Sequence, residues 1–266
     1  MQTIIDVGMH VGKDTQFYLD KGFRVVAVEA RPDFVAQNRV TFKSYIDDGR
    51  LEIVHGAVSD RAGTIPFTIF PDQDDWGTCD PHYTQLYLGR KKRYDVIDVP
   101  AVRFDDILRR VGIPYYLKID IEGSDLLCVK ALHGFAERPA YVSAEIATTG
   151  FDRPFETIAH LYVLGYRRFK VVNQALFSRR RCPHPPREGS FVDASFDWQM
   201  TGPFGEEAPG AWNDAERTLA TLRRIVRKES LFAPEGRLRR FAKVYDAVAR
   251  RMGGEPIGWY DVHAAR

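Results

Sequence analysis

The sequence predicts an α/β fold in which helices cover both faces of a mostly parallel sheet. Three observations carry this expectation. The expected first strand, Thr3–Val7, is short, apolar and β-branched, as a strand buried on both faces should be. From there, strand-like and helix-like stretches alternate along the chain. The composition, with 44% hydrophobic and 28% charged residues, is that of an ordinary globular protein.

The alternation continues through most of the chain. A glycine-bearing turn follows the first strand, and Gly22 is expected to stop the helix after it. Pro32 stands where the first turn of the next helix tolerates proline. Strands are expected at residues 3–7, 24–29, 51–55, 115–121, 141–146 and 167–172, and helices over about 13–21, 32–46, 105–111, 126–132 and 155–164.

An insertion interrupts this alternation. Residues 64–70 and 96–104 are expected to form an inserted pair of strands. Between them, residues 71–94 form a long polar and aromatic loop, and loops of this length inside a domain are usually functional. We expect the part from Asp74 to Asp80 to act as a lid or to contact an acceptor. The alternative is a solvent loop with Trp76 packed beneath it.

The last part of the chain has a different character. Prolines between residues 182 and 186 require irregular backbone, and amphipathic helices are expected over about 211–227 and 236–252. We therefore expect a core over residues 1–188. Residues 189–266 are expected to be a helical elaboration packed on that core, and not an independent domain.

The run Asp-Val-Gly-Met-His-Val-Gly at residues 6–12 ends the first strand. Glycines allow a sharp turn and a close approach to a ligand, and the following helix N-terminus attracts anions such as a carboxylate. The glycine spacing is not that of the dinucleotide pattern Gly-x-Gly-x-x-Gly. Asp6 would repel a pyrophosphate, but it suits a cationic ligand whose ammonium group it can bind.

Two further segments carry polar groups at strand ends. Glu29 ends the second expected strand, where a carboxylate can accept two hydrogen bonds from a ribose diol. In Lys-Ile-Asp-Ile-Glu-Gly at 118–123, the alternation of a strand places Lys118, Asp120 and Glu122 on one side, facing the crevice where open α/β sheets bind ligands. The alternative is a structural ion pair between Lys118 and either acid.

Together these segments resemble the FkbM-type methyltransferase family over roughly residues 3–146. The resemblance rests on Asp-Val-Gly-x-x-x-Gly at 6–12, Glu29, Gly-Ala-Val-Ser-Asp at 56–60 and Leu-Lys-Ile-Asp-Ile-Glu-Gly at 117–123. It implies a class I methyltransferase fold with a Rossmann-like sheet of about seven strands. It also implies S-adenosylmethionine as cofactor and O-methylation of a sugar, a glycolipid or a secondary metabolite.

The resemblance assigns roles to individual residues. The glycine turn lines the methionine end of the cofactor, Glu29 holds its ribose, and the stretch after Gly56 lies beside its adenine. The expected cofactor-binding residues are Asp6, Gly8, His10, Gly12, Thr15, Glu29, Ala30, Ala57, Val58 and Asp120. The expected catalytic residues are Asp120, Glu122 and His10.

Methyl transfer to a hydroxyl is helped by a base that takes the proton. Asp120 ranks first by its place at a strand end, with Glu122, His10 and His82 as the other candidates. The family commonly has asparagine at the place of His10, where histidine can make the same hydrogen bond or act as the base. No spacing of histidines and acids predicts a metal site, although Asp120 and Glu122 could hold a divalent cation.

The composition bears on the class of protein and on its expected place in the cell. The three cysteines are far apart and form no CxxC pair, which argues against a disulfide framework or a structural zinc site and favours the cytoplasm. The sequence has no signal-peptide pattern and no apolar stretch long enough to span a membrane. With a net charge of +2, the basic clusters at 179–181 and 217–227 are interpreted as solvated surface.

Other functions stay open at this point. An NAD-dependent oxidoreductase is the first alternative, although the glycine spacing argues against it. A non-catalytic binding or scaffold protein is the second, and a nucleic-acid methyltransferase is a weaker third. The expected partner is a small-molecule or saccharide acceptor; a nucleic-acid partner is not favoured, and a homo-oligomer is left open.

Overall fold

Seven strands, most of them short and apolar, form the main sheet of the protein. The structure is a computed structural model that describes residues 1–88, 93–232 and 236–266. Across the sheet the order is β3-β2-β1-β8-β9-β11-β10, and only β11 runs antiparallel to its neighbours. These strands are β1 (Thr3–Val7), β2 (Arg24–Glu29), β3 (Leu51–His55), β8 (Tyr116–Ile119), β9 (Tyr141–Ile146), β10 (Arg168–Asn173) and β11 (Tyr260–Ala265). The predicted mostly parallel α/β sheet is confirmed.

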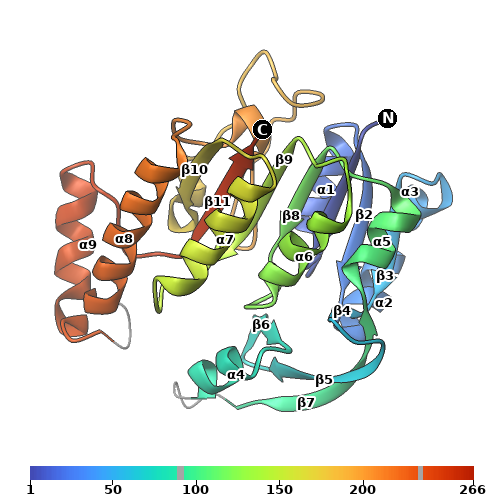
Figure 1. The fold of residues 1–266 in the computed structure, drawn as a ribbon, viewed down its shortest axis with the longest axis horizontal. Helices are drawn as coiled ribbons and strands as arrows, with labels where there is room; N and C mark the ends of the chain where they lie inside the picture. The colour runs from blue at the N-terminus through green and yellow to red at the C-terminus, as the bar shows by residue number, and fades with distance from the viewer. Residues whose placement is uncertain (89–92, 233–235) are drawn as a thin grey trace.

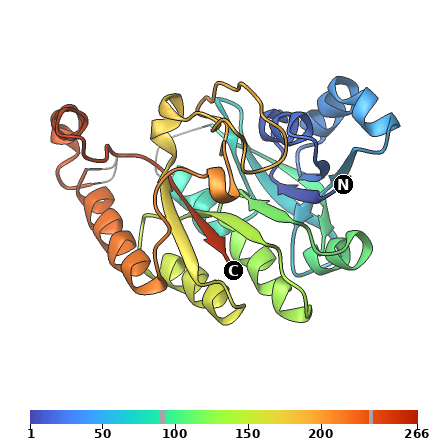
Figure 2. The ribbon, with the colours of Figure 1, turned by 90° about the horizontal axis from the view of Figure 1, so that it is seen from above.

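Alternate residues of the strands build two cores, one on each face of the sheet. Ile5 and Val28 belong to the core that α5, α6, α7 and α8 cover, whereas Ile4 and Val25 belong to the core that contains α1. Figure 2 shows these helices on opposite sides of the sheet. The helices are α1 (Lys13–Asp20), α2 (Pro32–Thr41), α3 (Lys43–Asp47), α5 (Phe104–Val111), α6 (Asp125–Ala131), α7 (Asp152–Val163), α8 (Ala215–Phe232) and α9 (Ala242–Arg251).

The helix expected over residues 32–46 is divided in two. Phe42 lies between α2 and α3 with φ −102° and ψ 20°, and its ring is buried at 3% exposure. Burial of this ring in the core beside α1 favours a break at this position over a straight continuation of α2. Within the described residues, no helix has the length and apolar character needed to cross a membrane.

A second, four-stranded sheet lies beyond the carboxyl edge of the main sheet (Figure 1). The predicted strand pair is confirmed, since β5 (Gly63–Phe70) pairs antiparallel with β7 (Asp95–Val102). The short β4 (Ala57–Val58) and β6 (Gln73–Thr78) complete this sheet, and α4 (Pro81–Leu88) follows β6.

The interpretation of residues 71–94 as a loop was therefore wrong for most of its described part, since β6 and α4 lie within it. The sequence Gln-Asp-Asp-Trp-Gly-Thr of β6 has weak strand propensity. β6 forms despite this weak propensity because it pairs with β5. The Trp76 ring also contacts the Phe70 ring, at 6.2 Å between centroids. Residues 89–92 of the expected loop lie outside the described residues.

The expectation for the chain end also needs a correction. Residues 189–266 do not only cover the sheet, because β11 enters it between β9 and β10, and all six of its residues are buried. The segment Tyr-Asp-Val-His-Ala-Ala includes an aspartate, a histidine and two alanines, so its sequence gives a weak strand signal. Two neighbouring strands, both distant in sequence, stabilise it.

Candidate functional site

A cavity of about 660 Å³ opens at the carboxyl ends of the parallel strands. Open α/β sheets bind ligands at this edge. One wall comes from the turns after β1, β2 and β8, and the opposite wall comes from the four-stranded sheet, including Phe67 and Trp76. Both sheets therefore contribute to a single site.

The turn after β1 depends on two glycines. Gly8 has φ +92°, and a Cβ atom there would lie 1.9 Å from the backbone oxygen of Asp120. Gly12 has φ +82°, and its Cβ would lie 2.5 Å from the Phe42 ring. Only glycine permits both the backbone conformation and these contacts. Gly8 lines the cavity, whereas Gly12 lies behind it and shapes the turn.

The carboxylate of Glu29 lies beside this turn and is fixed there by two hydrogen bonds. Its Oε2 accepts a hydrogen bond from the His10 backbone N–H at 2.7 Å, and its Oε1 accepts one from the Arg31 N–H at 2.8 Å. Burial raises the pKa of Glu29 to about 7, although both hydrogen bonds act to lower it. Each carboxylate oxygen has two acceptor positions, so the group can still accept hydrogen bonds from a ligand.

Asp6 and Thr15 lie beneath the cavity and do not line it. The Thr15 hydroxyl donates to Asp6 Oδ2 at 2.6 Å, and Lys118 Nζ lies 3.1 Å from Asp6 Oδ1. Lys118 also donates to the backbone oxygen of Gly8 at 2.8 Å. The structure thus places Asp6 in a buried ion pair that supports the turn.

The charged run after β8 reaches the cavity. β8 ends at Ile119, earlier than predicted, and Glu122 has a positive φ of 50°. Lys118, Asp120 and Glu122 all line the cavity, with 3.6 Å between Lys118 Nζ and Asp120 Oδ2. The structural alternative for Lys118 is therefore partly correct, although its nearest acid is Asp6, which the sequence did not suggest.

The remaining expected residues divide into two groups. Ala30, Ala57 and Val58 line an apolar part of the cavity, near Phe67. His10 lines it as well, with its ring edge-on to the Phe34 ring at 4.7 Å between centroids. His82 does not line the cavity; it is exposed at the start of α4, where its backbone N–H donates to Asp80 Oδ1.

Sequence reasoning missed three polar residues on the other side of the cavity. Glu145 is the second-last residue of β9, Asp261 pairs with it from β11, and Gln174 follows β10. Burial and the charges of Glu122 and Asp120 raise the pKa of Glu145 well above its usual value. An acid near the end of an apolar strand was a usable signal for Glu145, but Asp261 depends on the unexpected β11.

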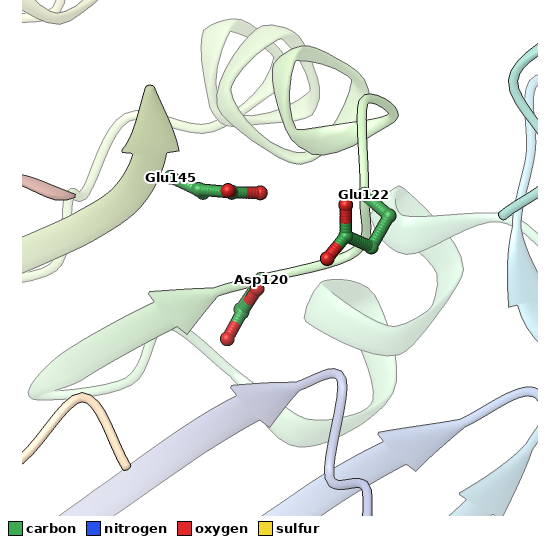
Figure 3. A group of neighbouring side chains, drawn as sticks. All are labelled: Asp120, Glu122 and Glu145. Atoms are coloured by element: carbon green, nitrogen blue, oxygen red, sulfur yellow. The ribbon is translucent and has the colours of Figure 1, made fainter. Parts of the chain in front are cut away.

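Three of these carboxylates converge. Asp120, Glu122 and Glu145 each offer an oxygen within 4.8 Å of the others. Figure 3 shows the three side chains turned toward one another from the ends of β8 and β9. Burial, followed by the charge of Asp120, raises the pKa of nearby Asp261 to about 8. Oxygen ligands in this arrangement can hold a hard divalent cation.

Comparison with known families shows which family the chain belongs to. The family described as "Methyltransferase FkbM domain" matches residues 6–168, which is more than half of the chain. The chain belongs to this family. The predicted resemblance is confirmed, and S-adenosylmethionine is the cofactor that this FkbM domain has to accommodate. A comparison with curated proteins finds no match.

Solved structures similar to this FkbM domain include three methyltransferases. An FkbM methyltransferase from Methylobacillus flagellatus KT is 19% identical (TM-score 0.39), with 65% of this chain and 40% of that chain covered. A precorrin-6y C5,15-methyltransferase from Geobacter metallireducens GS-15 is 12% identical (TM-score 0.37; 65% and 66% covered). A methyltransferase from Thiobacillus denitrificans, in complex with S-adenosyl-L-homocysteine, is 11% identical (TM-score 0.35; 100% and 85% covered). The chain thus spans less than two thirds of the first two proteins.

Proposed function

We propose that this protein transfers the methyl group of S-adenosylmethionine to a hydroxyl group of a sugar, a glycolipid or a secondary metabolite. The observation that carries the proposal is the continuity of one cavity, from the clamped carboxylate of Glu29 to the acids after β8 and β9. One end suits the donor, and the other end suits an acceptor rich in hydroxyl groups.

The donor end is built around Glu29. Its carboxylate, fixed by two backbone N–H groups, is placed to accept hydrogen bonds from the ribose diol. The turn at Gly8 receives the methionine part, and the apolar wall at Ala57 and Val58 receives the adenine. Gly12, Thr15 and Asp6 act indirectly in this proposal, because they hold the turn.

The acceptor end combines acids with aromatic rings. Trp76, Trp198 and Trp259 line the cavity together with Glu145 and Asp261. Carboxylates accept hydrogen bonds from hydroxyl groups, and aromatic rings offer flat apolar surfaces to the carbon faces of a sugar. An acceptor with several hydroxyl groups satisfies both kinds of contact.

The reaction breaks the bond between sulfur and the methyl carbon and forms a bond between that carbon and the acceptor oxygen. The hydroxyl proton passes to a carboxylate, and S-adenosylhomocysteine leaves. We assign the base role to Asp120, which lies at the end of β8 with 44% of its side chain exposed, beside Lys118. Glu122 and His10 line the same region and assist in binding or proton transfer.

The test is methyl transfer from isotopically labelled S-adenosylmethionine to a panel of hydroxylated sugars and metabolites, followed by linkage analysis of the product. Asp120→Asn is expected to lower kcat roughly 10²–10⁴-fold, as loss of a general base does. Asp106→Asn, an exposed acid on α5, is the matched control. Label on nitrogen or carbon would refute the O-methyl assignment, and equal rates for Asp120→Asn and wild type would refute the base role of Asp120.

Three expectations from the sequence remain part of this proposal. The protein is expected to act in the cytoplasm on a saccharide or another small molecule. Residues 1–188 are expected to carry the cofactor site, with the following residues as an elaboration of the same unit. A homo-oligomer is the third, and light scattering from the purified protein tests it.

A further inference from the structure

We propose that Asp120, Glu122 and Glu145 bind one divalent cation at the acceptor end of the cavity. Their nearest carboxylate oxygens all lie within 4.8 Å of one another (Figure 3). Ligands on opposite sides of one calcium or magnesium ion are about 4–5 Å apart, since metal–oxygen distances are about 2.0–2.6 Å. The three oxygens can therefore reach a single ion with small side-chain movements.

Asp120 shares its ion-pair partner with two other acids. Lys118 lies 3.6 Å from Asp120, but the same ammonium lies 3.1 Å from Asp6 and 3.9 Å from Asp14. Across the part of the chain that the structure describes, no lysine, arginine or histidine forms an ion pair with Glu145. Lys118 thus serves Asp6, Asp14 and Asp120 together, and Glu145 has no cationic partner among the described residues.

Unsatisfied acceptor atoms point to a ligand independently of the charge. Glu145 Oε2 is buried and has no hydrogen-bond partner. Gln174 is only 3% exposed and lines the same cavity, and its Oε1 also has no partner, while its Nε2 donates to Asp261. Buried acceptors of this kind are costly unless a donor or a cation reaches them. An amide oxygen is also a common ligand of hard cations.

The ligand set favours a particular class of ion. It contains only oxygen, without nitrogen or sulfur, and such sites select magnesium, manganese or calcium. Three carboxylate ligands leave coordination positions for water and for the acceptor. If the proposed methyl transfer holds, the acceptor hydroxyl occupies one of them, where the ion lowers its pKa and fixes its oxygen toward the donor methyl group. The binding of the ion itself does not depend on that role.

The experiment is titration of the chelator-treated full chain with Mn²⁺, followed by electron paramagnetic resonance, with and without S-adenosylhomocysteine. Wild-type protein is expected to show one saturable site. Glu145→Gln keeps the shape of the side chain and removes a charged ligand, so Mn²⁺ affinity is expected to fall at least about tenfold. Glu216→Gln, an exposed acid on α8, is the matched control and should bind as wild type does.

Circular dichroism and urea unfolding of each variant show whether the fold is intact, independently of any ligand. Saturable Mn²⁺ binding that Glu145→Gln weakens and Glu216→Gln leaves unchanged supports the cation site. Unchanged Mn²⁺ affinity in a folded Glu145→Gln variant, or no saturable Mn²⁺ binding by wild type, overturns it. Saturable Mn²⁺ binding by wild type that is lost in folded Glu145→Gln, with no binding of S-adenosylhomocysteine to the folded wild type, would uphold the cation site and refute the proposed function.

Discussion

Gly8 and Asp120 lie in direct backbone contact across the two central strands, so closely that a Cβ atom on Gly8 would be 1.9 Å from the carbonyl oxygen of Asp120. This contact joins the turn after β1 to the charged run after β8. It explains why these two motifs, more than a hundred residues apart, form one wall of the cavity.

The first prediction concerns this contact. Gly8→Ala should destabilise the fold by about 2–4 kcal/mol, because it adds a backbone clash to the strain of a positive φ. Gly49→Ala is the control, since Gly49 has φ +77° with nothing within 4 Å, and should cost only about 1–2 kcal/mol. Urea unfolding of both variants measures the difference. Equal losses would show that the approach to Asp120 can relax.

The second prediction concerns the buried ion pair between Lys118 and Asp6. Lys118→Met leaves two buried acids, Asp6 and Asp14, near an apolar side chain. The free energy of unfolding should fall by about 3–5 kcal/mol. The double variant with Asp6→Asn should lose less than the sum of the two single variants. Additive losses in this double-mutant cycle would mean that the two groups do not interact.

The third prediction concerns pH and Asp261. Burial raises the pKa of Asp261 to about 8 in the folded chain, above its ordinary value of 3.8. Its contribution to stability is therefore fully present below about pH 3.8 and is lost as the pH rises toward 8, by about 1.4 kcal/mol for each pH unit at most. Asp261→Asn should resemble wild type near pH 4 and be more stable at pH 8. Urea midpoints of chelator-treated protein measure this, and parallel pH profiles would contradict it.

Strand prediction from the sequence succeeded where the pattern was local. The bounds of β1, β2, β3 and β9 match the expected ranges because each is a short, largely apolar segment between turn residues. β11 was missed, because Tyr260–Ala265 becomes a strand only through neighbours that lie about 90 to 120 residues earlier in the chain.

Prediction of the site residues from the sequence also succeeded only where the signal was local. The turn at Gly8, Glu29 and the run from Lys118 to Glu122 could be found because each motif is contiguous in the sequence. Glu145, Gln174 and Asp261 come from three separate strand ends. Only the order of the sheet brings these three ends together, and that order depends on β11.

The fourth prediction concerns the pH dependence of cofactor binding. Glu29, with its pKa raised to about 7, accepts the ribose hydrogen bonds best when it is ionised. Affinity for S-adenosylhomocysteine should therefore fall as the pH drops from 8 to 6 and stay level above 8. Glu29→Gln should remove this dependence. The same slope in Glu29→Gln would assign the effect to another group.

Calorimetric titration of wild-type protein and Glu29→Gln with S-adenosylhomocysteine at pH 8 tests the central claim most directly. The account predicts one site in wild type and an affinity at least tenfold lower in Glu29→Gln, because hydrogen bonds to a charged group contribute about 1.5–3 kcal/mol. Glu216→Gln should bind as wild type does. No binding by folded wild-type protein, or equal affinity in Glu29→Gln, would contradict the placement of the cofactor against Glu29.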